Sequence, residues 1–485
     1  MSATDLDRQA TARIPTRSRQ GFILGLSSMQ LIAIVIGAAL LAGPVMTGSL
    51  VGCVVALPFE AVIGWLAFTR HEGRPRVAWI PIYVQFRLRT RKKEMMFRRR
   101  PLTAPRPVGN LGLTGQGTPL RILEDPESNV ALIEDPHQGS LTAILRVSHP
   151  GFALLDASTK DSKAASWSSL LASTARSGII RRTGVLSRTV PDTGREIADY
   201  WEAHRPAGDV TGQHIRAYDA LVRNAGQATT KHESYLFVQI NLARAAAQIK
   251  AAGGGAGAKL AVARREMTSF AQSANDAGLR TGGWLTTPDL TALIRTAVDP
   301  SAGLQLDTTT IGREIASAGP MVFDESWDHV HTDSAFHQTL WVSEWPRVPV
   351  SAGFLDHMLS VGIRRTFTHI FEPLSQDAAF RQVREAKGTL RANARVKAKH
   401  DIIADGRDAS EAEDIARQEL ELISGAAALR SAAFVTVSAP TLDQLTADVA
   451  ALRAGATKAQ LELRTMFGQQ GEAFMASALP LGKGL

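Results

Sequence analysis

The chain has 485 residues, a formal net charge of +8 and a single cysteine, Cys53. One cysteine excludes a disulfide framework or a cysteine-based metal site within the chain. The positive charge is unevenly placed, because residues 1–106 carry +11 and the remaining 379 residues therefore carry −3. Net charge thus gives no indication that the body of the protein binds nucleic acid, and we expect no direct nucleic-acid contact.

An uncharged run of forty residues, Gln20–Phe59, follows a short N-terminal tail. A helix needs about 20 apolar residues to cross a membrane, and the turn-type residues from Gly43 to Ser49 interrupt the run once. The pattern predicts a helical hairpin, and a signal peptide in place of the first span is the alternative. We therefore expect a cytoplasmic tail and two transmembrane helices, at 1–21, 22–42 and 48–68.

One ionisable residue, Glu60, falls inside the second span. Ionisable residues at this depth in a membrane usually have a function, so we treat Glu60 as a candidate functional residue. It occupies one place in a row of small residues with four-residue spacing, which favours close approach of another helix. Snorkelling of Glu60 towards Arg70 or His71 is the alternative. The predicted helix-packing residues are Gly48, Gly52, Ala56, Glu60 and Gly64.

Basic residues flank both predicted spans, with four arginines before the first and eleven Lys or Arg residues from Arg70 to Arg100 after the second. Lys and Arg near span ends mark the cytoplasmic side. We therefore expect a two-span plasma-membrane protein with both termini in the cytoplasm. Basic residues beside a membrane also attract anionic lipid headgroups. The predicted lipid contacts are Arg87, Arg89, Arg91, Lys92, Lys93, Arg98, Arg99 and Arg100.

The remaining chain alternates strand-like and helix-like segments, which predicts an α+β body of ferredoxin-like, split β-α-β units. A basic juxtamembrane segment and linker at 70–119 precede it. Its length allows two lobes of ordinary domain size, which we expect at 120–310 and 311–485. The clearest predicted strands, rich in Val, Ile and aromatic residues, are 130–134, 141–147, 179–189, 235–242, 336–345, 364–371 and 432–437.

The body contains no persuasive catalytic motif. A phosphate-binding loop needs the pattern G-x-x-x-x-G-K-[ST], which neither Gly253–Lys259 nor the segment around Lys483 satisfies. No G-x-S-x-G elbow frames a serine nucleophile. Alternation along a predicted strand places His329, His331 and Asp333 on the same face, and these side chain types can bind a divalent metal. Polar residues on an edge strand explain the pattern more simply. We expect no cofactor, no metal site and no enzymatic activity.

Three stretches carry a resemblance to a known family. Residues 461–485 combine a strand, a Gln-rich helix and a Leu-Pro-Leu exit, and Arg146–Asp156 forms a strand followed by a His-Pro-Gly turn. Both resemble the amino-terminal, non-catalytic domain of VirB/TraC-type ATPases of conjugative type IV secretion. The two spans, with Gly73-Arg74-Pro75 and Trp79-Ile80-Pro81 after them, resemble the small membrane subunit of such systems. Together they resemble an actinobacterial family of conjugation-associated membrane proteins.

The chain stops at Leu485, where the ATPase core would begin in that family. The resemblance therefore implies a structural subunit of a conjugative or type IV-like secretion apparatus, a scaffold that docks a separate ATPase and other membrane subunits in an oligomeric complex. A two-span component of a type VII (ESX-like) secretion system is one alternative. A membrane-tethered metal-dependent enzyme that uses the histidine face is the other.

Overall fold

The structure is a computed structural model, and its described residues form two compact units. One unit is built from Glu94–Leu374 and Leu429–Leu485, and the other includes Pro15–Lys93 and Ser375–Ala428. The described residues are 26–48, 50–99, 111, 113, 119–148, 155–191, 195–204, 212–225, 230–303, 315, 318–346, 350, 351, 353–399, 406–424 and 427–484.

The unit that includes Pro15–Lys93 is mostly helical, with two long apolar helices, a two-stranded turn, a basic helix and a separate helical hairpin. The helices are α2 (Ser28–Met46), α3 (Leu50–Phe68), η1 (Arg76–Trp79), α4 (Ile80–Arg91), α13 (Gln376–Lys399) and α14 (Gly406–Ile423). The strands β1 (Arg70–His71) and β2 (Arg74–Pro75) pair in antiparallel fashion.

The first apolar helix is displaced from its expected place. It begins at Ser28, where Ser27 and Gln30 form a capping box, and it continues through Pro44 to Met46. Proline lacks the backbone donor that would bond the carbonyl four residues earlier, so α2 loses one bond at Pro44 without ending there. The Thr47 N–H and hydroxyl both donate to the Gly43 carbonyl and close the helix end. The prediction that the turn begins at Gly43 was therefore wrong, because residues 43–46 are helical and the turn begins at Thr47.

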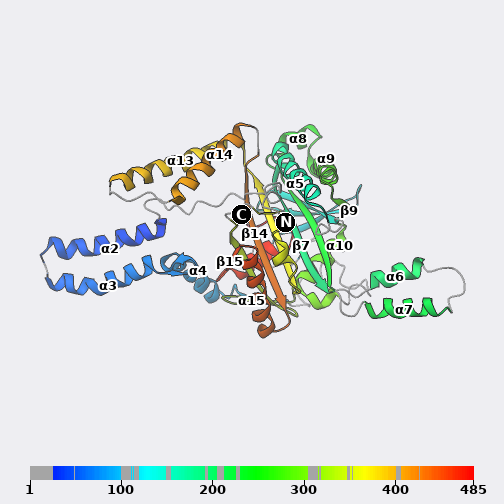
Figure 1. The fold of residues 1–485 in the computed structure, drawn as a ribbon, viewed down its shortest axis with the longest axis horizontal. Coiled ribbons are helices and arrows are strands. Elements are labelled where there is room, and N and C mark those ends of the chain that lie inside the picture. The colour runs from blue at the N-terminus through cyan, green and yellow to red at the C-terminus, as the bar shows by residue number, and fades with distance from the viewer. Residues whose placement is uncertain are drawn as a thin grey trace, which may run out of the picture. The chain divides into compact units, whose positions relative to one another are not determined.

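The other unit contains one large antiparallel sheet (Figure 1). Its main path runs in the order β3-β10-β11-β12-β14-β13-β7-β8-β6-β5-β4, with β9 paired to β6 and β15 paired to β12. The strands are β3 (Met96–Arg98), β4 (Arg121–Asp125), β5 (Val130–Asp135), β6 (Ser140–Ser148), β7 (Ile180–Pro191), β8 (Thr230–Asn241), β9 (Arg280–Trp284), β10 (Val322–Glu325), β11 (Val330–Thr332), β12 (Phe336–Glu344), β13 (Arg365–Pro373), β14 (Leu429–Ala439) and β15 (Glu462–Thr465).

The sheet consists of two halves with the same order of elements. In the first half the chain runs β6, α5 (Ala157–Ser177), β7, a helical pair α6 (Arg195–His204) and α7 (Gln213–Ala225), then β8, α8 (Ala246–Ala251), α9 (Gly255–Asp276), β9 and α10 (Thr287–Val298). In the second half it runs β12, α12 (Asp356–Leu359), β13, the pair α13 and α14, then β14, α15 (Leu442–Lys458), β15 and α16 (Gln470–Ser477). A 3-10 turn, η4 (Pro300–Ala302), follows α10.

Strand register confirms that the halves are equivalent in detail. The start of β6 pairs with β5 and its end pairs with β9, just as β12 pairs first with β11 and then with β15. The halves join where β7 pairs with β13, and Leu186 lies opposite Thr368. Residue pairs at equal distances on the two sides of this point consist of equivalent residues with the two strands interchanged. A local two-fold axis therefore passes between Leu186 and Thr368.

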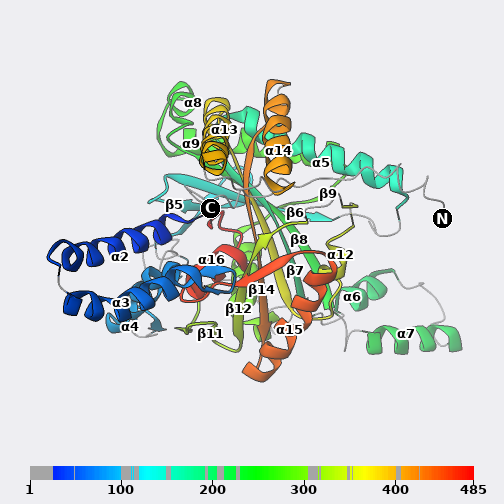
Figure 2. The same cartoon turned by 60° about the vertical axis from the view of Figure 1, so that its left-hand side comes forward.

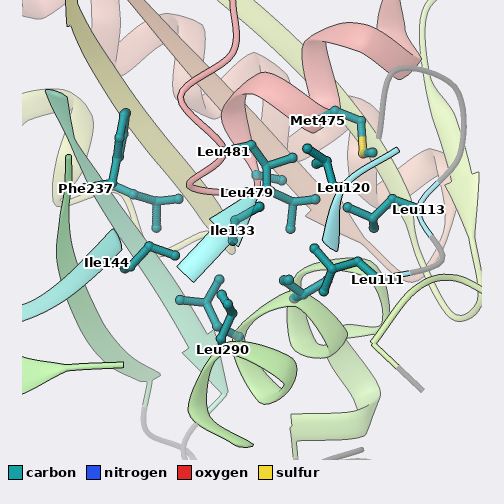
Figure 3. Packing of buried hydrophobic residues seen from close by; sticks show 14 of the residues in the cluster. Leu111, Leu113, Leu120, Ile133, Ile144, Phe237, Leu290, Met475, Leu479 and Leu481 are labelled. Atoms are coloured by element: carbon teal, nitrogen blue, oxygen red, sulfur yellow. The ribbon is translucent and has the colours of Figure 1, made fainter. Parts of the chain in front are cut away.

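Alternating side chains place separate hydrophobic clusters on the two faces of the sheet. On one face, β6 and β8 pack with α9, and β12 and β14 pack with α15; Figure 2 shows these helices beside the sheet. On the other face, one cluster joins both halves and includes Leu290 of α10 and Phe474 of α16. Figure 3 shows Leu479 and Leu481 within this cluster, close to Ile133.

The expected division of the body can be compared with the structure. The two expected lobes correspond in part to the two halves, but the halves share a continuous sheet and one hydrophobic cluster. Most residues around the predicted lobe boundary at 310 lie outside the described residues. The same holds for most of residues 101–119 in the predicted segment and linker at 70–119.

Candidate membrane and assembly surfaces

The outward faces of α2 and α3 are apolar and exposed. Both helices are long and apolar enough to cross a membrane, and little of either is buried within the protein. Met46 is 88% exposed and Leu50 is 82% exposed, whereas a core helix of a soluble protein would bury such side chains. Exposed apolar residues therefore surround the hairpin, as a lipid environment would require.

The inward faces of the two helices contain small and polar residues. Ala56 is buried, and Gly52, Glu60 and Gly64 are partly buried on the same helix, whereas Gly48 lies in the turn with a φ of +62°. The structure thus gathers most of the predicted stripe on the side of α3 that packs against α2 of the same chain. Packing of a further helix against these residues stays a prediction.

Gly37 of α2, which sequence reasoning did not single out, provides the space for Glu60. A Cβ atom at Gly37 would lie 2.7 Å from the Glu60 Oε2 atom. Glu60 Oε1 is shut off from solvent and has no hydrogen-bond partner among the described residues. The signal that could have identified Gly37 is its place in a buried row of α2 with Gln30 and Ala33.

Polar contacts hold the far end of the hairpin, where α3 leads into β1, β2 and η1. Gln30 Nε2 donates to the Ala67 carbonyl at 2.7 Å and so ties α2 to the end of α3. The Arg76 guanidinium lies 4.1 Å from the centre of the Trp65 ring, and Trp79 Nε1 donates to the His71 carbonyl. Tryptophan and arginine side chains are well suited to a membrane–water interface.

The predicted lipid-binding residues fall into two groups. Arg87, Arg91, Lys92 and Lys93 are exposed on or just after α4, and Arg89 is partly exposed. Arg98 lies on β3 in the other unit, where it forms a bidentate ion pair with Asp324 that raises the Arg98 pKa. The Arg99 N–H donates to the Met321 carbonyl, and Arg100 lies outside the described residues. The sequence did not predict that Arg98 would form an ion pair with Asp324.

The histidine face does not converge on one point. His329 contacts Asp328, and His331 stacks on Phe336. The Asp333 carboxylate instead accepts two backbone N–H groups and contacts Arg295 at 2.7 Å. Among the residues that the structure describes, no group of three or more His, Cys, Asp or Glu side chains could hold a metal ion.

The C-terminal segment that carries the family resemblance crosses the joint between the halves. Gln470 is fully buried and bonds both the N–H and the carbonyl of Thr339. The Gly482 carbonyl accepts from Arg182 at 2.9 Å, and Lys483 lies 3.3 Å from Asp135 of the first half. The segment is therefore an integral part of the sheet's central packing. No protein-family model matches the chain, and no curated protein matches its sequence.

Proposed function

We propose that this protein is a membrane-anchored structural subunit of a conjugative or type IV-like secretion apparatus, and that its body docks a separate ATPase. The hairpin α2–α3 spans the plasma membrane, and both termini and the sheet lie in the cytoplasm. The protein carries out no catalysis of its own. The observation that carries the proposal is the exposed apolar surface of α2 and α3 attached to a body of two equivalent halves.

The strand order within each half supports the finer assignment of the fold. The order β9-β6-β8-β7 recurs as β15-β12-β14-β13, with every neighbouring pair antiparallel. This order supports a ferredoxin-like, split β-α-β unit with a helical pair inserted between its second and third strands. A sheet that repeats this arrangement suits a scaffold that contacts several partner subunits.

Lipid contact is assigned to the exposed basic residues of the juxtamembrane helix. Each basic residue near an anionic membrane surface contributes about 1 kcal/mol. We leave Arg98 out of this contact because Asp324 already neutralises its charge. The acidic balance of the body favours an ATPase surface that is basic, since complementary charge speeds association.

Labelling of single cysteines tests the membrane topology. Cys53→Ala provides a cysteine-free background, to which Thr47→Cys in the hairpin turn or Ala409→Cys on α14 is added. In intact cells, a membrane-impermeant maleimide should label the Thr47→Cys protein and should reach the Ala409→Cys protein only after lysis. Equal labelling of both variants before lysis would show that the hairpin does not span the membrane as proposed.

Purification from native membranes tests the assignment to a secretion apparatus. The tagged full-length chain, extracted in mild detergent, should co-purify with an ATPase encoded by a neighbouring gene, and the chain alone should not hydrolyse ATP. ATP hydrolysis by the purified chain would contradict the scaffold role. Co-purification with small WxG-type substrates in place of conjugation proteins would favour the type VII alternative.

A further inference from the structure

Three arginines among the described residues are buried in the sheet: Arg182, Arg188 and Arg365, with exposed fractions of 5%, 6% and 2%. A buried guanidinium normally requires a carboxylate, because an isolated charge is strongly disfavoured away from water. Two of the three follow this rule. Arg182 contacts Glu372 at 3.0 Å, and Arg188 contacts Glu233 at 2.7 Å.

Arg365, at the start of β13, has no carboxylate partner among the described residues. Its Nη1 donates to the Thr189 hydroxyl at 2.8 Å, and its Nε is shut off from solvent without a hydrogen-bond partner. Burial lowers the pKa of Arg365 to about 10, so the side chain remains charged near neutral pH. Among the described residues, the site therefore contains a positive charge and a free Nε donor, with the neutral Thr189 hydroxyl as acceptor and no anion.

The equivalent position in the other half is occupied by a residue that needs no anion. Strand register makes Thr183 the equivalent of Arg365, since they pair with Val238 and Val437 at corresponding places. The Thr183 hydroxyl donates to the Phe237 carbonyl and is thereby satisfied within the sheet. The unpaired cation is thus a specific feature of the second half and is not required by the shared fold.

Neighbouring groups around Arg365 can also donate hydrogen bonds. The Thr189 hydroxyl oxygen accepts from Arg365 and lies 3.3 Å from His232 Nδ1. When His232 carries its hydrogen on Nδ1, that nitrogen also donates to the Thr189 oxygen, and the hydroxyl hydrogen stays available for a further acceptor. His232 is exposed near the start of β8. The exposed histidine marks the side from which a ligand would approach Arg365.

We propose that Arg365 and Thr189, with His232 at the solvent edge, form a binding site for a small phosphate-bearing ligand. A guanidinium recognises phosphate oxygens through directed, charge-assisted hydrogen bonds. The Arg365 guanidinium and the Thr189 hydroxyl together present donors that a phosphate, with more oxygens and more negative charge, satisfies better than a carboxylate. The bound phosphate supplies the negative charge that Glu372 and Glu233 supply to the other two arginines. This site is independent of the secretion role proposed above.

Thermal unfolding of the full-length chain in detergent tests the site, with inorganic phosphate, AMP and acetate compared at constant ionic strength. A ligand that binds only the folded state raises the unfolding temperature. Phosphate should raise it for the wild type and for the control Arg280→Met, which alters an exposed arginine on β9, but not for Arg365→Met. An equal rise with AMP identifies a phosphate monoester as the ligand, and a rise with phosphate alone identifies the free ion.

The same variants separate ligand binding from a purely structural role for Arg365. Without phosphate, Arg365→Met should unfold at no lower temperature than the wild type, because the substitution removes an unpaired buried charge. Thr189→Val keeps the charge and should weaken phosphate binding at least tenfold by calorimetry. The proposal is overturned if phosphate stabilises wild type and Arg365→Met equally, if Thr189→Val binds phosphate as tightly as wild type, or if acetate matches phosphate.

Discussion

The two halves of the sheet follow one strand order but fill equivalent positions with different side chains. At the joint, the first half places Gly184 opposite Phe237, and the second half places Thr366 opposite Thr436. In the first half the large Phe237 ring therefore lies beside a residue without a side chain. In the second half two threonines of medium size take these places. The comparison teaches that total volume and alternation of apolar residues maintain this architecture, while the individual residues are free to change.

Polarity differs between the halves as well. By strand register, His337 of the second half is equivalent to Thr142 of the first, and His369 is equivalent to Ser187. His337 is buried between Thr332 and Ser438, and the His369 Nε2 atom has no hydrogen-bond partner among the described residues. Hydroxyls do not titrate in the accessible pH range, whereas histidines do. The second half should therefore be the acid-sensitive one.

The largest predicted effect comes from adding a side chain at Gly184. A Cβ atom there would lie 2.5 Å from the His369 carbonyl oxygen and 2.5 Å from the Phe237 ring, so backbone must move. We expect Gly184→Val to lower the free energy of unfolding by about 3 kcal/mol or more. Urea unfolding followed by tryptophan fluorescence measures the change. The matched control is Thr366→Ala, which should cost about 1 kcal/mol; an equal loss in both variants would break the proposed difference between the halves.

An intermediate effect is expected on acidification. Burial lowers the pKa of His337 to about 3, with a smaller contribution from Arg364, and burial lowers that of His369 to about 3. Between about pH 6.5 and pH 3 the unfolded chain therefore binds more protons than the folded protein. The two histidines therefore cause no loss of stability above pH 6.5. Below it, the free energy of unfolding should fall by up to about 1.4 kcal/mol per histidine for each pH unit.

Exchange of the histidines for their equivalents measures this contribution. The double variant His337→Thr and His369→Ser should show a flatter dependence of unfolding free energy on pH between 6.5 and 4.5. Burial opposes the effect of Arg188 on Glu233, but the net result is a lowered Glu233 pKa. The stabilising contribution of Glu233 is therefore lost only at lower pH, and it serves as the internal reference. A slope identical to that of the wild type would assign the acid sensitivity to other groups.

The smallest effect is expected in the helical pairs inserted in each half. Trp201 of α6 donates to Asp219 of α7 and contacts the Tyr218 ring, whereas Lys387 of α13 forms an ion pair with Glu419 of α14. The ion pair is about one-third exposed, so it contributes about 0.2–1 kcal/mol and is screened by salt. Raising NaCl should therefore speed proteolysis within α13–α14 more than within α6–α7. An equal response in both pairs would contradict this assignment.

Local sequence was sufficient to place most strands. Val130–Glu134, Leu141–Val147 and Tyr235–Leu242 alternate or concentrate β-branched residues, and each overlaps a strand of the structure. The short strand β3 was missed, because Met96–Arg98 lies within a basic run that favours a different interpretation. It pairs with β10, and there Arg98 meets Asp324, a contact between residues 226 positions apart. No local pattern encodes such a pairing.

The candidate sites divide in the same way. The sequence by itself determined that two apolar helices follow a short tail and that basic residues lie beside them, because length, hydropathy and charge are local properties. Only the tertiary structure decided that Gly37 accommodates Glu60, that β7 pairs with β13, and that, within the described part of the chain, Arg365 is the buried arginine without a carboxylate partner. These features depend on which distant residues meet, and that is determined by packing of the whole sheet.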